Sequence, residues 1–294
     1  MSLLAGLDDS VAAPLTPSSP SVRLAIFTLV RGGQDRTDYS VYAVRCRRLH
    51  NTSVFNPSPL LFDDLAFHEG NLPDAETVAT LEANLNVRFV DARPYGAFTG
   101  PPPHIRRRTG DQKRLRQGGY ALGYRYMCRF FAMQWIHALS KYEYAMRLDE
   151  DVLVHRMVDV LSPLLPPPGG SNVDGKQVYG YALKTEEKHK LTYATLPVWL
   201  DDYIQRKNIQ PTLPPVGNAT RDAMYFTNFF VTRVSWWQRS DVQSFLKDID
   251  ESGFLYDYRW GDAPIQTAAL HLFAEVLPVH VSVPYSHIST ENEI

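Results

Sequence analysis

The chain has 294 residues, of which 44% are hydrophobic and 21% are charged, proportions that are ordinary for a globular protein. This length suits one large α/β domain or two small ones. The formal net charge of -2 argues against a nucleic-acid-binding protein, because such proteins usually carry a strong basic excess. Two cysteines are too few for a disulfide scaffold, and no apolar run approaches the ~20 residues that a membrane-spanning helix needs.

The first third of the chain alternates between predicted strands and helices. Residues 1–20 mix Ser, Pro, Ala and Thr without periodicity, which predicts a flexible leader ahead of one domain over residues 21–294. Apolar patterning then predicts strands at 22–30, 60–62 and 87–90, and helices at 38–50 and 75–85. This alternation predicts a parallel sheet with helices on both faces.

An acidic cluster follows the next predicted strand. From Tyr142 to Leu148, large apolar side chains alternate with others at the period of two that is typical of a strand, and Asp149, Glu150 and Asp151 come directly after it. The carboxyl ends of strands in an α/β sheet are where such sheets bind ligands. Two carboxylates one residue apart can hold a hard divalent cation against phosphate oxygens. The alternative is a solvated acidic turn, since short acidic triplets also arise by chance.

The remaining segments surround this strand. A basic loop at 101–119 is predicted to be either a mobile lid that neutralises a diphosphate or a solvated charged loop. We expect a helix at 124–140 and strands at 177–183, 223–232 and 279–283. Further helices are expected at 157–161, at 191–206, from Ser240 to a stop at Gly253, and directly after Asp262. The strand at 223–232 carries a polar insertion at Thr227-Asn228.

Several stretches, in this order, resemble glycosyltransferase family 15, the fungal-type α-1,2-mannosyltransferases. They are Tyr124–Phe130, the strand and acidic cluster at Tyr142–Asp151, Thr227-Asn228-Phe229, Arg259–Pro264 after a Gly253-Phe254 turn, and a Tyr285-x-His287 near the end. The similarity spans roughly residues 22 to 290. The run Arg-Trp-Gly-Asp-Ala-Pro is the most specific of these motifs.

The resemblance implies a single GT-A type glycosyltransferase domain, with a mixed, mostly parallel sheet flanked by helices. It implies a retaining transferase that uses Mn²⁺ and moves mannose from GDP-mannose to a glycan acceptor hydroxyl. The alternatives are a related transferase with another nucleotide sugar, or a non-catalytic sugar-binding relative. It also implies a location in the Golgi lumen behind a membrane anchor that this sequence lacks, with the cytoplasm as the alternative.

The resemblance also assigns site residues by position. Asp149, Asp151 and His287 would hold the metal ion, with Glu150 beside them at the donor. Asp262 is expected either to orient the acceptor hydroxyl and take up its proton or only to cap the following helix. The remaining expected donor-binding residues are Tyr124, Arg125, Arg129, Arg259 and Trp260. Arg125 and Arg129 lie four residues apart on one helical face, which suits a diphosphate or, equally, structural ion pairs.

One position departs from the family pattern. The family has a Glu, its proposed nucleophile, directly after Asn-Phe, where this chain has Phe230. A phenyl ring can neither attack nor accept a proton. We therefore predict front-face attack, in which the departing phosphate takes the acceptor proton and Asn228 steadies a cation-like sugar. Phe230 would then be a wall of the sugar pocket, or else part of the core.

Overall fold

The computed structural model describes residues 22–30, 39–51, 61–72, 74–100, 105, 122–155, 159–165 and 176–287. The predicted leader at 1–20 and the basic loop at 101–119, apart from Ile105, lie outside these residues. The side chain of His287 also lies outside them. In the described part of the chain, no helix combines the length and the apolar character that crossing a membrane requires.

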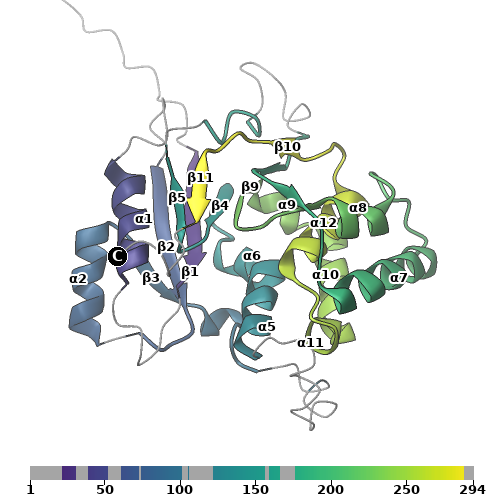
Figure 1. Cartoon of the computed structure of the whole chain (residues 1–294), viewed down its shortest axis with the longest axis horizontal. Helices are drawn as coiled ribbons and strands as arrows, with labels where there is room; N and C mark the ends of the chain where they lie inside the picture. Colours follow the sequence, from purple (N-terminus) through teal and green to yellow (C-terminus); the bar gives the residue numbers. More distant parts are fainter. Residues whose placement is uncertain are drawn as a thin grey trace, which may run out of the picture.

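A seven-stranded sheet forms the centre of the described structure (Figure 1). Its order is β10-β6-β9-β4-β1-β2-β3. Every neighbouring pair is parallel except those of β9, which runs antiparallel to both β4 and β6. The predicted mixed, mostly parallel sheet is therefore confirmed. The strands are β1 (Arg23–Leu29), β2 (Leu61–His68), β3 (Arg88–Asp91), β4 (Tyr144–Leu148), β6 (Tyr179–Tyr181), β9 (Phe229–Arg233) and β10 (Val279–His280).

Helices gather on both sides of this sheet. Figure 1 shows α1 (Ser40–Asn51) and α2 (Ala75–Leu85) together at one end of the molecule, beside β1 to β3. At the other end lie α7 (Lys190–Lys207), α8 (Val216–Asp222), α9 (Val234–Trp237), α10 (Ser240–Ser252), α11 (Phe254–Asp257) and α12 (Asp262–Phe273). Short elements complete the chain: a 3₁₀ turn at Arg93–Tyr95, and the strand pairs β5 (Val152–Val154) with β11 (Tyr285–His287) and β7 (Lys184–Thr185) with β8 (Met224–Tyr225).

Both faces of the central strands are buried, because successive apolar side chains point to opposite faces of the sheet. Ala25 and Phe27 of β1 join the larger core, while Leu24 and Ile26 point into a second core on the opposite face. The larger core is closed by the helical segment 122–138, which consists of α5 (Leu122–Arg129), a π-helical turn (Phe130–Gln134) and α6 (Trp135–Ala138). Cys46 and Cys128 are both buried and unpaired.

Four predicted elements differ from the structure. The strand predicted at 60–62 continues as β2 through two acidic residues to His68, because Asp64 is buried and its carboxylate accepts hydrogen bonds from Arg45 at 2.7 and 2.9 Å. The helix predicted at 124–140 contains a π-helical turn. The strand predicted at 223–232 is two strands, β8 and β9, separated by the polar Thr227-Asn228. Of the helix predicted at 157–161, the described residues 159–161 are not helical.

Candidate functional site

The acidic cluster forms a tight turn at the carboxyl end of β4. The Val152 amide donates to the Asp149 carbonyl at 3.1 Å, which closes the turn, and the Asp149 amide donates to the Asn228 carbonyl at 3.1 Å. The strand that follows, β5, pairs with β11, so that residue 287 lies opposite Val152. The turn is thus fixed between the start of β9 and the end of the described chain. Its three acidic side chains are half-buried.

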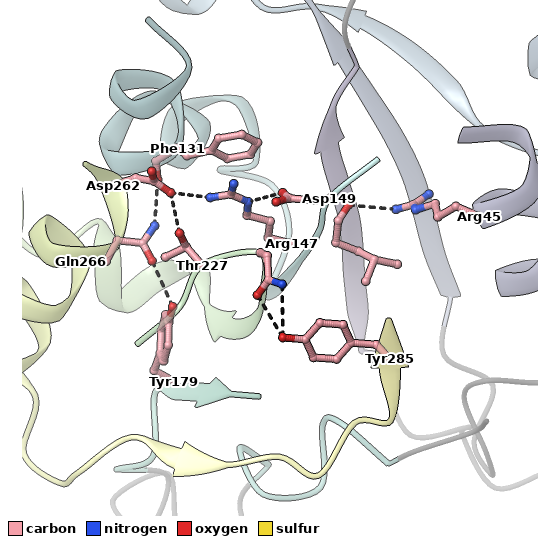
Figure 2. Close-up of polar contacts among 11 residues, drawn as sticks. Arg45, Phe131, Arg147, Asp149, Tyr179, Thr227, Asp262, Gln266 and Tyr285 are labelled. Atoms are coloured by element: carbon pink, nitrogen blue, oxygen red, sulfur yellow. Dashed lines mark hydrogen bonds and ion pairs between the residues drawn. The ribbon is translucent and has the colours of Figure 1, made fainter. Parts of the chain in front are cut away.

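Arg147 ties this turn to the start of α12. Its Nε donates to Asp149 Oδ1 at 2.8 Å, and its Nη1 donates to Asp262 Oδ2 in a short ion pair (Figure 2). The guanidinium carbon lies 3.4 Å from the centre of the Phe131 ring. Burial lowers the pKa of Arg147, but the two carboxylates outweigh burial and hold that pKa above its ordinary value. Arg147 therefore remains a cation that joins two acidic groups from distant parts of the chain.

The pKa of the Asp149 carboxyl lies above its ordinary value. Burial raises this pKa, and the negative charges of Asp262 and Asp151 raise it further, while the positive charge of Arg147 opposes these effects without cancelling them. Arg147 contacts Oδ1 of this carboxylate.

Asp262 is the first residue of α12 and its side chain is 9% exposed. Besides Arg147, the Thr227 hydroxyl donates to the same Oδ2 atom at 2.7 Å. The N-cap of α12 is Gly261, which makes no side-chain cap hydrogen bond. Asp262 is therefore held by tertiary contacts, and the capping interpretation does not describe it.

Asn228 is oriented by Tyr285. The Asn228 amide donates to the Tyr285 hydroxyl at 3.2 Å, and that hydroxyl lies 3.3 Å from Asn228 Oδ1. Asn228 is 3% exposed, and the Tyr285 ring stacks beside Phe229. The two residues that the sequence places almost 60 positions apart thus form one side of the acidic turn.

Two arginines gather near the amino end of α12. Arg259 Nη2 donates to the Tyr124 hydroxyl at 3.0 Å, and its backbone is left-handed with φ 58°, an unfavourable conformation for a residue with a side chain. The Thr192 hydroxyl donates to the Arg259 carbonyl at 2.9 Å and so supports this conformation. Burial lowers the pKa of Arg125 and the neighbouring positive charge of Arg259 lowers it further, while the negative charge of Asp257 opposes both effects. Arg125 is 1% exposed, and Arg259 is half-buried.

Three predicted donor-binding residues lie elsewhere. Arg129 forms a two-pronged ion pair with Asp250, with both contacts at 2.7 Å, as in the structural alternative. Trp260 is 1% exposed and its Nε1 donates to the Thr195 hydroxyl at 2.9 Å, so it packs in the core. Phe230 is fully buried against core aromatic rings, those of Phe27, Trp135 and Tyr179. The structure thus places Phe230 in the hydrophobic core rather than at an open surface.

The predicted metal ligands are described only in part. Asp149 and Asp151 project from one turn, and the side chain of His287 lies outside the described residues. Among the residues that the structure describes, no group of three or more His, Cys, Asp or Glu side chains could hold a metal ion. The two aspartates supply the hard oxygen donors that divalent cations such as Mn²⁺ accept.

Sequence reasoning missed Arg147, Thr227 and Tyr285 as members of the site. Arg147 carried a usable signal, since it is a charged residue inside an apolar strand, and a buried guanidinium needs carboxylate partners. Thr227 and Tyr285 carried none beyond their place in the motifs.

Comparison with known proteins places these residues in a family. A family model described as glycolipid 2-alpha-mannosyltransferase matches residues 104–292, which is more than half of the chain. The chain belongs to this family. The matched region includes the acidic turn, Arg147, Asn228, Asp262 and Tyr285.

Individual relatives are distant in sequence. The probable mannosyltransferase MNT3 of Candida albicans is 27% identical over 180 residues, covering 58% of this chain and 45% of that protein. The probable mannosyltransferase KTR4 of Saccharomyces cerevisiae is 28% identical over 181 residues, covering 53% of this chain and 36% of that protein. The chain spans about half the length of the curated relatives it matches, or less.

Solved structures of mannosyltransferases share the fold. Ktr4p from S. cerevisiae superposes with a TM-score of 0.70 at 20% identity, covering 95% of this chain and 74% of that one. Core-mannan synthase A from Aspergillus fumigatus, described as an Mn/GDP form, has a TM-score of 0.66 at 17% identity, covering 98% and 82%. At these identities the likeness shows the fold alone, and the predicted GT-A type domain is confirmed.

Proposed function

We propose that this chain is a metal-dependent, retaining glycosyltransferase that moves mannose from GDP-mannose to a hydroxyl of a glycan acceptor. The observation that carries the proposal is the acidic turn at the carboxyl end of β4, joined through Arg147 to Asp262 of α12. This arrangement lies at the sheet edge where α/β folds bind nucleotides. Family membership supports sugar transfer, and the Mn/GDP description of the Aspergillus relative supports the choice of metal and nucleotide.

Asp149 and Asp151 would hold the metal ion, together with His287 at the neighbouring end of β11. Manganese bound there would neutralise charge on the departing nucleoside diphosphate as a Lewis acid. Glu150, in the same turn, is proposed to contact the donor. The guanidinium pair of Arg125 and Arg259 would bind an anionic part of the donor, with Tyr124 holding Arg259 in place.

On the acceptor side, Asp262 would orient the incoming hydroxyl. Both contacts that the described residues make with its carboxylate fall on Oδ2, which leaves Oδ1 for a substrate hydroxyl. A carboxylate already bound by a guanidinium is better suited to orienting a hydroxyl than to removing its proton. The departing phosphate therefore takes that proton in this mechanism, and Asn228 steadies the cation-like sugar through its carbonyl oxygen.

The burial of Phe230 supports front-face attack. The position where the family has its proposed nucleophile is occupied here by a core phenylalanine, fully buried. No covalent glycosyl-enzyme is expected, and mass spectrometry after quenching with a slow fluorinated donor tests this directly. A covalent sugar on an Asp or a Glu contradicts the mechanism.

The same residue favours a second candidate, a sugar-nucleotide-binding relative without transfer activity. Retention of Asp149, Asp151 and Asp262 argues against it. Screening nucleotide sugars for slow manganese-dependent hydrolysis separates the two: a transferase releases free sugar from its own donor, whereas a binding protein leaves every donor intact. Hydrolysis of a donor other than GDP-mannose reassigns the sugar while keeping the enzyme class.

The compartment is part of the proposal. We place the domain in the Golgi lumen, where nucleotide-sugar-dependent glycan synthesis takes place, with the cytoplasm as the alternative. Localisation of the tagged full-length protein by microscopy tests this placement.

A further inference from the structure

An unusual backbone turn lies next to the site. In the π-helical turn Phe130–Gln134, the Trp135 amide donates to the Phe130 carbonyl, five residues earlier. In an α-helix the same amide would donate to the Phe131 carbonyl. That carbonyl instead accepts a hydrogen bond from Nε2 of Gln266 at 2.8 Å (Figure 2). π-turns are rare and often occur at functional sites.

Gln266 is itself held in one orientation. The Tyr179 hydroxyl donates to Gln266 Oε1 at 3.1 Å, so the side-chain nitrogen must face the Phe131 carbonyl. Both Gln266 and Tyr179 are fully buried. Gln266 lies one helical turn after Asp262 in α12, so the two side chains share a helix face. The same face of α12 therefore contacts both Arg147 and the π-turn.

The π-turn places an aromatic ring beneath the central cation of the site. The Phe131 ring centre lies 3.4 Å from the Arg147 guanidinium carbon, a close cation–π contact. In the β4–β9 ladder, the residue opposite Arg147 is Phe230, so no carboxylate reaches Arg147 from that strand position. The Arg147 guanidinium therefore stacks on the Phe131 ring and donates hydrogen bonds to Asp149 and Asp262.

We infer that Phe131 and Gln266 are positioning residues: Gln266 maintains the π-turn, and the π-turn holds the Phe131 ring where it fixes the Arg147 guanidinium between Asp149 and Asp262. This inference rests on the proposed function for its catalytic consequence. The geometric part can be measured without any activity. Neither residue touches substrate; both act through Arg147.

The test uses the ring-current shift that a phenyl ring imposes on a guanidinium stacked over it. In the full chain with ¹⁵N-labelled arginine, the Arg147 side-chain Nε–H resonance is assigned by comparison with the Arg147→Lys variant. Gln266→Met keeps side-chain length but removes the donor, and Phe131→Leu removes the ring without touching Gln266. Thr232→Val is the matched control, because it removes a fully buried hydroxyl that donates to the Val178 carbonyl at 2.8 Å in the same sheet.

Both Phe131→Leu and Gln266→Met should remove the upfield shift of the Arg147 resonance, while Thr232→Val keeps it. In activity, each of the first two should lower kcat by about tenfold to a hundredfold, the scale of a misplaced catalytic group, with donor KM nearly unchanged. The double variant should lose little more than either single one, because both act on one cation. A folded Gln266→Met protein that keeps the shift, or additive losses in the double variant, overturns the inference.

The two proposals fail in different ways. If the wild type shows the shifted resonance but transfers no sugar, the proposed function is wrong and the geometric inference stands. If the wild type is active and the resonance is unshifted, the positioning inference is wrong. Should Gln266→Met not fold, Phe131→Leu decides the question through kcat alone, because loss of its ring removes the shift in any case: an unchanged kcat overturns the positioning role of Phe131.

Discussion

Replacing Arg147 with methionine tests the connection on which the site depends. Met fills much of the same volume and removes the charge, so that Asp262 loses its ion-pair partner and, among the described residues, keeps only its hydrogen bond from Thr227. The side chains of Arg147 and Asp262 are 5% and 9% exposed, so this pair behaves as a buried one. Breaking a buried pair by removing one partner costs about 3–5 kcal/mol, because a charge stays buried without compensation.

Asp149 contributes less to this loss. Its side chain is 27% exposed, so water can replace the lost contact. The total destabilisation of Arg147→Met should therefore stay at about 3–5 kcal/mol. This is a large share of the free energy of unfolding of native proteins, which is roughly 5–15 kcal/mol. Urea unfolding followed by circular dichroism measures it.

The double variant Arg147→Met/Asp262→Asn provides the control. With the buried negative charge also removed, it should be less destabilised than Arg147→Met alone, by about 1–3 kcal/mol. The reasoning is refuted if the double variant shows the sum of the two single losses, or if Arg147→Met unfolds at the wild-type urea concentration.

Three further outcomes follow from the same geometry. Asp151→Asn, on a half-buried turn, should abolish most manganese-dependent turnover and leave the free energy of unfolding within about 0.5 kcal/mol of wild type; near-full manganese-dependent activity in this variant would show that Asp151 is no metal ligand. Asp262→Asn should lower transfer and spare donor affinity, as measured by calorimetric titration of GDP with Mn²⁺; collapse of donor binding contradicts the acceptor-side role. Burial and the hydrogen bond to Asp63 raise the pKa of Tyr142 from 10.0 to about 12, so its stabilising contribution is complete below pH 10 and is lost between those values. Tyr142→Phe should therefore lose less stability than wild type between pH 9 and pH 11.5, and an unchanged slope in urea midpoints argues against this interpretation.

Local pattern was sufficient to predict much of the frame of the site. The alternation from Tyr142 to Leu148 predicts β4, and the break at Asp149 predicts the acidic turn that closes it. The helix at 75–85 begins and ends where the sequence predicts, because Asp74 caps its start and Asn86 ends it in a left-handed conformation. Each of these features depends on residues that are close together in the chain.

The partners across the site could not be predicted in the same way. Arg147 and Asp262 are 115 positions apart, and Gln266 and Phe131 are 135 apart. Periodicity reports which face of an element is buried, and it carries no information on what packs against that face. The strand predicted to end at Asp63-Asp64 shows the consequence, since Arg45 makes a buried acid tolerable inside β2.

The π-turn was beyond reach for a related reason. The apolar stripe from Met127 to Leu139 fits a regular helix, and the extra residue in the turn is stabilised by an amide from α12. The order of the motifs was enough to predict the family and the fold. The positions of Phe230, Trp260 and Arg129 could not be predicted, because they depend on packing that the motifs do not encode.

The most direct test of the account is the product formed from GDP-mannose. The purified chain is incubated with GDP-mannose, Mn²⁺ and methyl α-mannoside as a simple acceptor, and the product is identified by NMR from its anomeric one-bond carbon–proton coupling. The account predicts transfer that depends on manganese and gives an α-linked mannoside, so that the donor configuration is retained. A β-linked product, or an intact donor after prolonged incubation with manganese and acceptor, contradicts it.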